Sequence, residues 1–116
     1  MTSDILTVTA HDGPGASTVL KATGEIDRDS RERLRLVAEQ AIIDGHPRVV
    51  IDLAAVTFCD SSGLSLLVDL HREAEAHGGW LRLAAAHAVL RDMLRITHLD
   101  RLFATYDTVE AAVEQP

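Results

Sequence analysis

A carboxylate and two hydroxyls stand side by side in residues 58–67, whose sequence is FCDSSGLSLL. Asp60, Ser61 and Ser62 together suit three kinds of chemistry. Their oxygens could cap a helix by accepting hydrogen bonds from its first backbone N–H groups. A serine could also be a catalytic nucleophile activated by a base, or the acceptor of a phosphate that a partner protein reads.

Catalysis is the least supported of these interpretations. Six histidines could supply a base, but the G-x-S-x-G motif of hydrolases is absent. His71 and Glu75 have the i,i+4 spacing of metal ligands, yet H-E-x-x-H is missing, which favours an ordinary helix face. Cys59 has no adjacent cation to activate its thiol, so we expect a small buried residue. The sequence predicts no enzyme, no metal site and no cofactor.

A second acidic segment, GEID at residues 24–27, follows a predicted strand and precedes a predicted helix. Open α/β sheets gather functional side chains at the carboxyl edge of their parallel strands. Asp60 follows the central predicted strand and Asp27 follows the strand before it. Both acids are therefore expected at the same edge of the sheet. The sequence leaves two roles open for Asp27, a contact with a partner or a cap on the first helix.

The elements that must position these residues alternate between strand and helix. Apolar patterns predict strands at residues 5–10, 18–23, 48–53 and 80–84, with an edge strand at 102–106. Helical periodicity predicts helices at residues 29–44, 62–77, 87–96 and 108–114. The turn-forming segment 11–16 joins the first two strands as a hairpin. This order indicates an α/β domain with a mixed sheet and crossover helices.

Finer features of these elements also follow from the pattern. Asp29 and Glu32 have the spacing of a capping box at the start of the first helix. The continuous apolar run at residues 49–51 predicts a strand covered on both faces. In the strand at 80–84, Leu81 and Leu83 should lie on one side and Arg82 on the other. The third helix is expected to pack through four apolar residues: Val89, Leu90, Met93 and Leu94.

Composition restricts the kinds of partner. The chain has 116 residues, which fits one domain, and 47% of them are hydrophobic, which is typical of a folded protein. A net charge of −7 disfavours direct binding to nucleic acid. No apolar run approaches the roughly 20 residues that span a bilayer, and the first residues lack a signal-peptide pattern. We therefore expect a cytoplasmic protein that binds neither nucleic acid nor membrane.

The motifs in combination are more specific than any one of them. In chain order they read GEID, then VVIDLAAVTFCDSSGLSLL, then HGGWLRL. This pattern resembles the STAS domain family over about residues 5–113, most specifically at residues 60–64. The resemblance implies one STAS domain over residues 1–116. Its fold would be a mixed sheet of four to five strands, with about four helices mainly on one side. The chain departs from the common pattern at Ser65, where glycine is frequent, and at residues 97–99.

The resemblance also implies a function. Stand-alone bacterial members are anti-sigma factor antagonists, also called anti-anti-sigma factors. The unphosphorylated antagonist binds an anti-sigma factor, itself a serine kinase with a bound nucleotide, and so releases a sigma factor. The kinase phosphorylates one serine, which ends binding, and a serine phosphatase restores it. By position the phosphoacceptor is Ser61, and the implied partner contacts are Asp27, Asp60, Ser61, Ser62 and Gly63.

Two other functions are compatible with the same fold. The domain could be a subunit of a larger assembly, such as a stressosome-like or lipid-transport complex, that binds its partner without phosphorylation. It could instead sense a nucleotide or another small molecule. Phosphorylation by a kinase supplied with ATP would separate the first function from these two.

Overall fold

The computed structural model describes residues 6–114, so the start of the strand expected at residues 5–10 lies partly outside it. A sheet of five strands has the order β1-β2-β3-β4-β5. β1 pairs antiparallel with β2, and the remaining neighbours pair in parallel. The strands are β1 (Thr7–Asp12), β2 (Ser17–Ile26), β3 (Arg48–Cys59), β4 (Trp80–Ala84) and β5 (Ala104–Tyr106). The mixed sheet and the β1–β2 hairpin confirm the sequence prediction.

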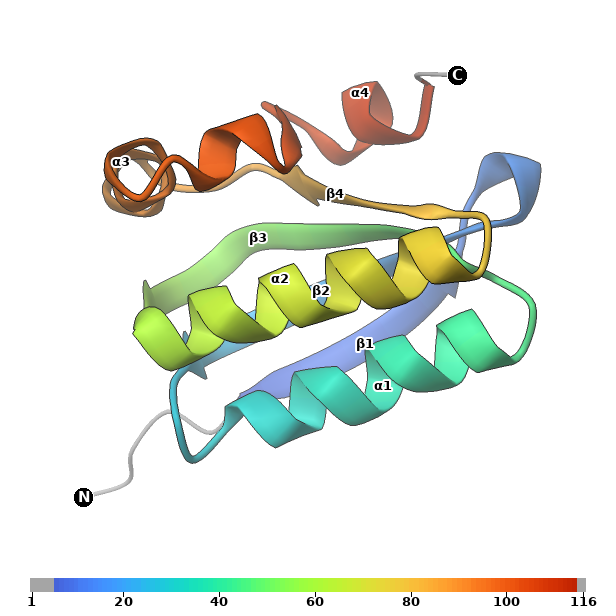
Figure 1. The fold of residues 1–116 in the computed structure, drawn as a ribbon, viewed down its shortest axis with the longest axis horizontal. Helices are drawn as coiled ribbons and strands as arrows, with labels where there is room; N and C mark the ends of the chain where they lie inside the picture. Colours follow the sequence, from blue (N-terminus) through green and yellow to red (C-terminus); the bar gives the residue numbers. More distant parts are fainter. Residues whose placement is uncertain (1–5, 115–116) are drawn as a thin grey trace.

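Four helices accompany the sheet, as predicted. They are α1 (Arg31–Ile43), α2 (Ser61–Ala76), α3 (Ala88–Ile96) and α4 (Val109–Glu114), with short 3₁₀ turns at Pro14–Ala16 and Leu99–Arg101. α1 and α2 lie side by side across one face of the sheet (Figure 1). No helix among residues 6–114 is long and apolar enough to cross a membrane.

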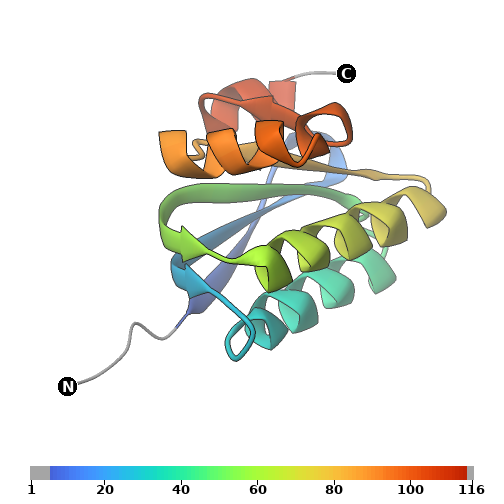
Figure 2. The same cartoon turned by 60° about the vertical axis from the view of Figure 1, so that its left-hand side comes forward.

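Most of the core lies between the sheet and the first three helices. α1 contributes Leu34, Ala38 and Ile42 to it, and α3 contributes Leu90 and Leu94. α2 buries the largest set of residues: Gly63, Leu64, Leu66, Leu67, Leu70, His71 and Ala74. In a second view, rotated from the first, α1 and α2 form one layer, and α3 and α4 lie above them (Figure 2). α1, α2 and α3 contribute to one core cluster and α4 to another, so the helices pack mainly on one side, as expected.

The other face of the sheet carries a smaller cluster under α4. Val50 of β3 and Ala84 of β4 pack there with Ala112 of α4, so β3 is covered on both faces as predicted. Arg82 also points to this side, opposite Leu81 and Leu83. Its guanidinium lies 3.7 Å from the centre of the Trp80 ring and donates to the Ala112 carbonyl oxygen over 2.8 Å. A buried arginine therefore helps to hold α4 on the sheet.

Several boundaries differ from the sequence prediction. β2 ends at Ile26 and not at residue 23, β5 begins at Ala104 and not at residue 102, and α1 begins at Arg31 and not at residue 29. β3 continues to Cys59, not Leu53, because its second half pairs with the end of β2, where Thr23 lies opposite Ala55 and Ile26 opposite Cys59. Register shifts within this pairing interrupt the apolar alternation from which a strand is recognised. β1 likewise continues to Asp12, because the hairpin pairing extends to the turn.

The predicted capping box of α1 is wrong. Ser30 is the N-cap residue, and its side chain makes no cap hydrogen bond to the helix. Glu32 instead forms an ion pair with Arg35, one turn further along the helix. The first backbone donors ahead of α1 are satisfied by Asp27, whose geometry belongs to the site.

Candidate functional site

Asp60 is the N-cap of α2. Its backbone is extended, with φ −93° and ψ −175°, and its Oδ1 accepts a hydrogen bond from the Gly63 N–H over 2.9 Å. An aspartate in this position satisfies a helix donor and complements the helix dipole. Ser61 then becomes the first helical residue, at the carboxyl edge of the parallel strands. The cap predicted at this motif is present, and Asp60 provides it.

Gly63 allows α2 to approach the end of β2 closely. A Cβ atom at this position would lie 2.7 Å from Cys59 Sγ, 2.9 Å from Ile26 Cγ2 and 2.9 Å from the Ile26 carbonyl oxygen. The carbonyl oxygen could move only with the strand that carries it. A glycine is therefore required for packing here. The contact predicted between Gly63 and a partner stays a prediction.

The three residues that follow the cap differ in exposure. Ser61 is exposed, Ser62 is half-buried and Gly63 is buried. Successive helical residues point about 100° apart, so the two hydroxyls face different surroundings. Ser61 is the more accessible hydroxyl.

Asp27 forms a capped turn beside this site. Its Oδ1 accepts from the backbone N–H of Ser30 over 2.9 Å and from that of Asp29 over 3.1 Å, and lies 2.9 Å from the Ser30 hydroxyl. Its carbonyl oxygen accepts from the Arg31 N–H. The Ser30 hydroxyl, followed by the Ser30 N–H, lowers the pKa of Asp27 below its ordinary value. Asp27 therefore caps the turn that leads into α1, and its contact with a partner stays a prediction.

The two acidic turns meet through Ile26, the last residue of β2. The Asp60 N–H donates to the Ile26 carbonyl oxygen over 3.1 Å, directly before Asp27 in the chain. Arg31 adds a second link, since its Nη1 donates to the Ser62 carbonyl oxygen over 3.3 Å. Sequence reasoning missed Arg31, although a cation four residues after Asp27 was visible. The structure thus brings Asp27, Asp60 and Ser61 to one edge of the sheet.

An apolar hollow adjoins the same edge. Its volume is about 470 Å³, and it lies between the end of β3 and α3.

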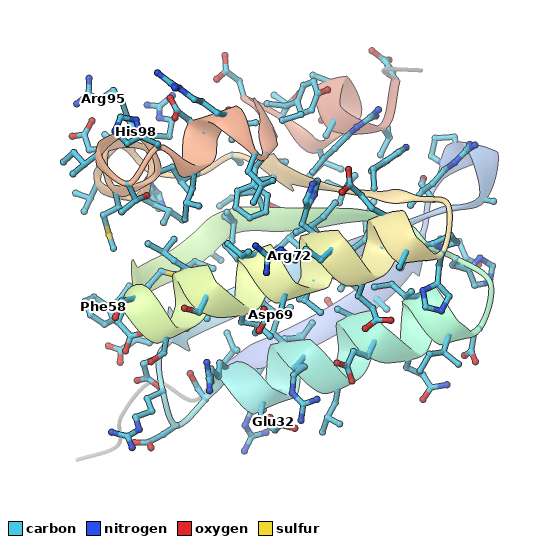
Figure 3. The ribbon with its side chains drawn as sticks, viewed as in Figure 1. Glu32, Phe58, Asp69, Arg72, Arg95 and His98 are labelled. Atoms are coloured by element: carbon cyan, nitrogen blue, oxygen red, sulfur yellow. The ribbon has the colours of Figure 1, made fainter. Side chains whose placement is uncertain are left out.

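The end of β3 and the N-cap of α2 line the hollow on one side, with Val56, Thr57, Phe58, Cys59 and Asp60. The N-cap of α3 and the helix itself line the other side, with His87, Val89, Leu90 and Met93. Phe58 is 52% exposed and Val89 is 73% exposed. Phe58 lies at the end of β3, beside the start of α2 (Figure 3). Val89 was predicted to pack inward, and that prediction is wrong, because Leu90 and Leu94 make the core contact of α3.

Cys59 and His71 are packing residues in this arrangement. Burial, followed by the charge of Asp60, raises the pKa of the Cys59 thiol to about 12, so the thiol is protonated and unreactive. The His71 ring meets the Phe103 ring edge-on at 5.5 Å, and its Nε2 lies 3.3 Å from the Glu75 carboxylate. Within residues 6–114, no group of three histidine, cysteine or acidic residues could hold a metal ion.

The sequence that forms this site matches a known protein family. Residues 6–112 match the STAS domain. The chain belongs to the STAS domain family. The match covers the sheet, α1 to α3 and most of α4, and it includes both acidic turns and Ser61.

Relatives in this family include anti-sigma factor antagonists. The anti-sigma-F factor antagonist RsfB of Mycobacterium tuberculosis is 31% identical over 112 residues, which cover 95% of this chain and 88% of RsfB. The crystal structure of an anti-sigma factor antagonist from Mycobacterium paratuberculosis superposes with a TM-score of 0.86, at 29% identity and 98% coverage of both chains. The STAS fold expected from the sequence is confirmed.

A more distant likeness concerns the fold alone. The Bacillus cell fate determinant SpoIIAA, in its phosphorylated form, superposes with a TM-score of 0.73 at 24% identity. That match covers 93% of this chain and 97% of the SpoIIAA chain.

Proposed function

We propose that this STAS domain is an anti-sigma factor antagonist that phosphorylation of Ser61 controls. The unphosphorylated form binds an anti-sigma factor that is also a serine kinase, and binding releases a sigma factor. The observation that carries this proposal is the exposed Ser61 hydroxyl, held at the start of α2 beside the Asp60 cap. Two relatives that match nearly the whole chain are named as anti-sigma factor antagonists, which supports the proposal.

Phosphorylation would change charge at a fixed position. The kinase transfers the γ-phosphoryl group of ATP to Ser61 Oγ, the hydroxyl proton leaves, and ADP is the second product. The phosphoserine adds about −1.5 to −2 charges and three acceptor oxygens. Backbone N–H groups and the dipole of α2 favour negative charge at this end of the helix, so the fold tolerates the group. A serine phosphatase removes it by hydrolysis.

The added charge opposes binding because of where it lies. Asp27 and Asp60 already stand at this edge, in a chain of net charge −7. Burying a further charge under a partner that fits the neutral hydroxyl costs free energy, and like charges across an interface oppose association. The domain stays folded and the complex dissociates.

A binding role fits the surroundings of Ser61 better than catalysis does. No hydrogen bond joins the Ser61 hydroxyl to a base anywhere in residues 6–114. A serine nucleophile requires such a base within hydrogen-bond reach. In this proposal the protein is a cytoplasmic regulator and not an enzyme, it uses no cofactor, and its partners are proteins and not nucleic acid or membrane.

The test uses each serine-kinase anti-sigma factor that the host genome encodes, purified and supplied with ATP. We expect intact mass to show one added phosphate on the wild type and on Ser62→Ala, and none on Ser61→Ala. Peptide mapping that places the phosphate on Ser62 would overturn the assignment of Ser61. If no kinase binds or modifies the chain, the antagonist function is wrong, and a role as an assembly subunit or a small-molecule sensor replaces it.

A further inference from the structure

The hollow between β3 and α3 is fixed in place by the fold. His87, the N-cap residue of α3, lies with its Nε2 2.9 Å from the Ala54 carbonyl oxygen of β3. Leu90 and Leu94 anchor the same helix in the core. The two walls of the hollow are therefore joined at one end and packed beneath. A ligand would meet a preformed concave surface there.

Two apolar side chains stand exposed on its walls without a role in packing the core. Phe58 is 52% exposed at the end of β3, and Val89 is 73% exposed at the start of α3. Removing apolar surface from water favours association, and exposed apolar residues around a concavity are typical of interaction sites. The hollow suits an apolar side chain and not a charged one.

The hollow and the serine share a boundary residue. Asp60 lines the hollow and also caps the helix that Ser61 begins. A protein that docks over Ser61 therefore covers at least this rim. The acidic rim, together with the net charge of −7, favours a basic residue in the partner.

We infer that this hollow is the apolar part of the surface that binds the anti-sigma factor. The anti-sigma factor would insert an apolar side chain between Phe58 and Val89, with a basic residue beside it that faces Asp60. The inference rests on the proposed function, since it names the surface that the same partner uses. It assigns the affinity to the hollow and the regulation to Ser61.

The test compares two similar substitutions on one helix. Val89→Gln removes an apolar side chain from the hollow. Ile96→Gln makes a similar change at a residue that is 72% exposed on α3 and does not line the hollow. Calorimetric titration with the anti-sigma factor that binds the wild type should show affinity reduced at least about tenfold for Val89→Gln. Ile96→Gln should bind within about threefold of the wild type. Thermal melts of both variants show whether each stays folded.

A second variant and one further measurement keep the inference separate from the proposed function. Phe58→Gln should also weaken binding, and it acts from the opposite wall. If both wall variants bind like the wild type while Ser61→Asp does not, the hollow does not bind the anti-sigma factor, and the inference is overturned. The phosphorylation switch would still stand. If the wild type sediments as a dimer that Val89→Gln dissociates, the occupant is a second copy of this chain, and the inference is overturned.

Discussion

The backbone N–H of Asp60 donates to the carbonyl oxygen of Ile26 over 3.1 Å, which joins the start of α2 to the end of β2. Asp27 follows Ile26 directly, so this one backbone hydrogen bond holds the two acidic turns close together. Gly63 permits this approach, because any side chain there would meet Ile26. A phosphate on Ser61 would therefore add charge to a rigid edge, and a change in binding would require no change of fold.

Gly63→Ala should destabilise the protein. The added Cβ would lie 2.9 Å from a backbone oxygen of β2 and 2.7 Å from Cys59 Sγ. Overpacking of this kind costs about 1–3 kcal/mol, and the higher helix propensity of alanine offsets at most about 1 kcal/mol. Urea unfolding at neutral pH should show a lower free energy of unfolding. Ser65→Ala, at an exposed position on the same helix, serves as the control and should be nearly neutral.

Asp27→Asn should lower the melting temperature by a few degrees at neutral pH, because the neutral amide accepts hydrogen bonds from Ser30 and Asp29 more weakly than the carboxylate. The folded-state pKa of Asp27 lies below its unfolded value of about 3.9. The carboxylate therefore stabilises the fold above pH 3.9, and this contribution is lost as the pH falls through the folded pKa.

The measurement for Asp27 is a series of thermal melts of the wild type and Asp27→Asn between pH 6 and pH 3. We expect the difference in melting temperature to shrink as the pH falls below about 4. A difference that stays constant over this range would show that the charge of Asp27 does not stabilise the fold. Unchanged melting with weaker binding of the anti-sigma factor would instead restore Asp27 as a direct partner contact.

Local patterns predicted those parts of the fold that depend on local sequence. The helix from Ser61 and the strand Trp80–Ala84 carry clear periodicity, and both were found within one residue of the expected bounds. The cap of α1 was assigned to Asp29, because a capping box is recognised by spacing alone. The N-cap residue is Ser30 instead, and Asp27 accepts hydrogen bonds from the backbone ahead of the helix. The carbonyl oxygen of Glu25 and the hydroxyl of Ser30 help to form this turn, which spacing does not reveal.

The hollow between β3 and α3 could not be predicted either, because it depends on tertiary packing that local sequence does not reveal. Val89 and Leu90 are equally apolar in the sequence, and only the packing of α3 against β3 decides which of them is buried. The second half of β3 is recognisable only through its pairing with β2, where the register shifts. Phe58 was therefore not placed on a strand, and its exposure beside α3 was not foreseen.

Cys59 should resist alkylation in the native protein. Its side chain is buried, and burial raises the pKa of the thiol to about 12, so the reactive thiolate is scarce at pH 8. We expect iodoacetamide to modify the native protein at least about a hundredfold more slowly than the protein unfolded in urea. Mass spectrometry over time measures both rates. Equal rates would show that the junction of β3 and α2 opens readily.

Ser61→Ala and Ser61→Asp should separate the fold from the switch. Asp60 provides the side-chain cap of α2, so removing the Ser61 hydroxyl should cost less than about 1 kcal/mol of stability. The aspartate adds a negative charge that the helix dipole favours, so this variant should fold as well. Thermal melts of both variants should stay close to that of the wild type.

The same two variants should differ in their affinity for the anti-sigma factor. Ser61→Ala keeps a neutral surface and should bind the anti-sigma factor within about threefold of the wild type, whereas Ser61→Asp should bind at least about tenfold more weakly. Ser65→Asp provides the matched control, because it places the same charge on an exposed residue one turn further along α2. Calorimetric titration of the three variants measures these affinities. If Ser61→Asp is folded and binds as tightly as Ser61→Ala, charge at this position does not control the complex, and an assembly subunit that works without phosphorylation becomes the better account.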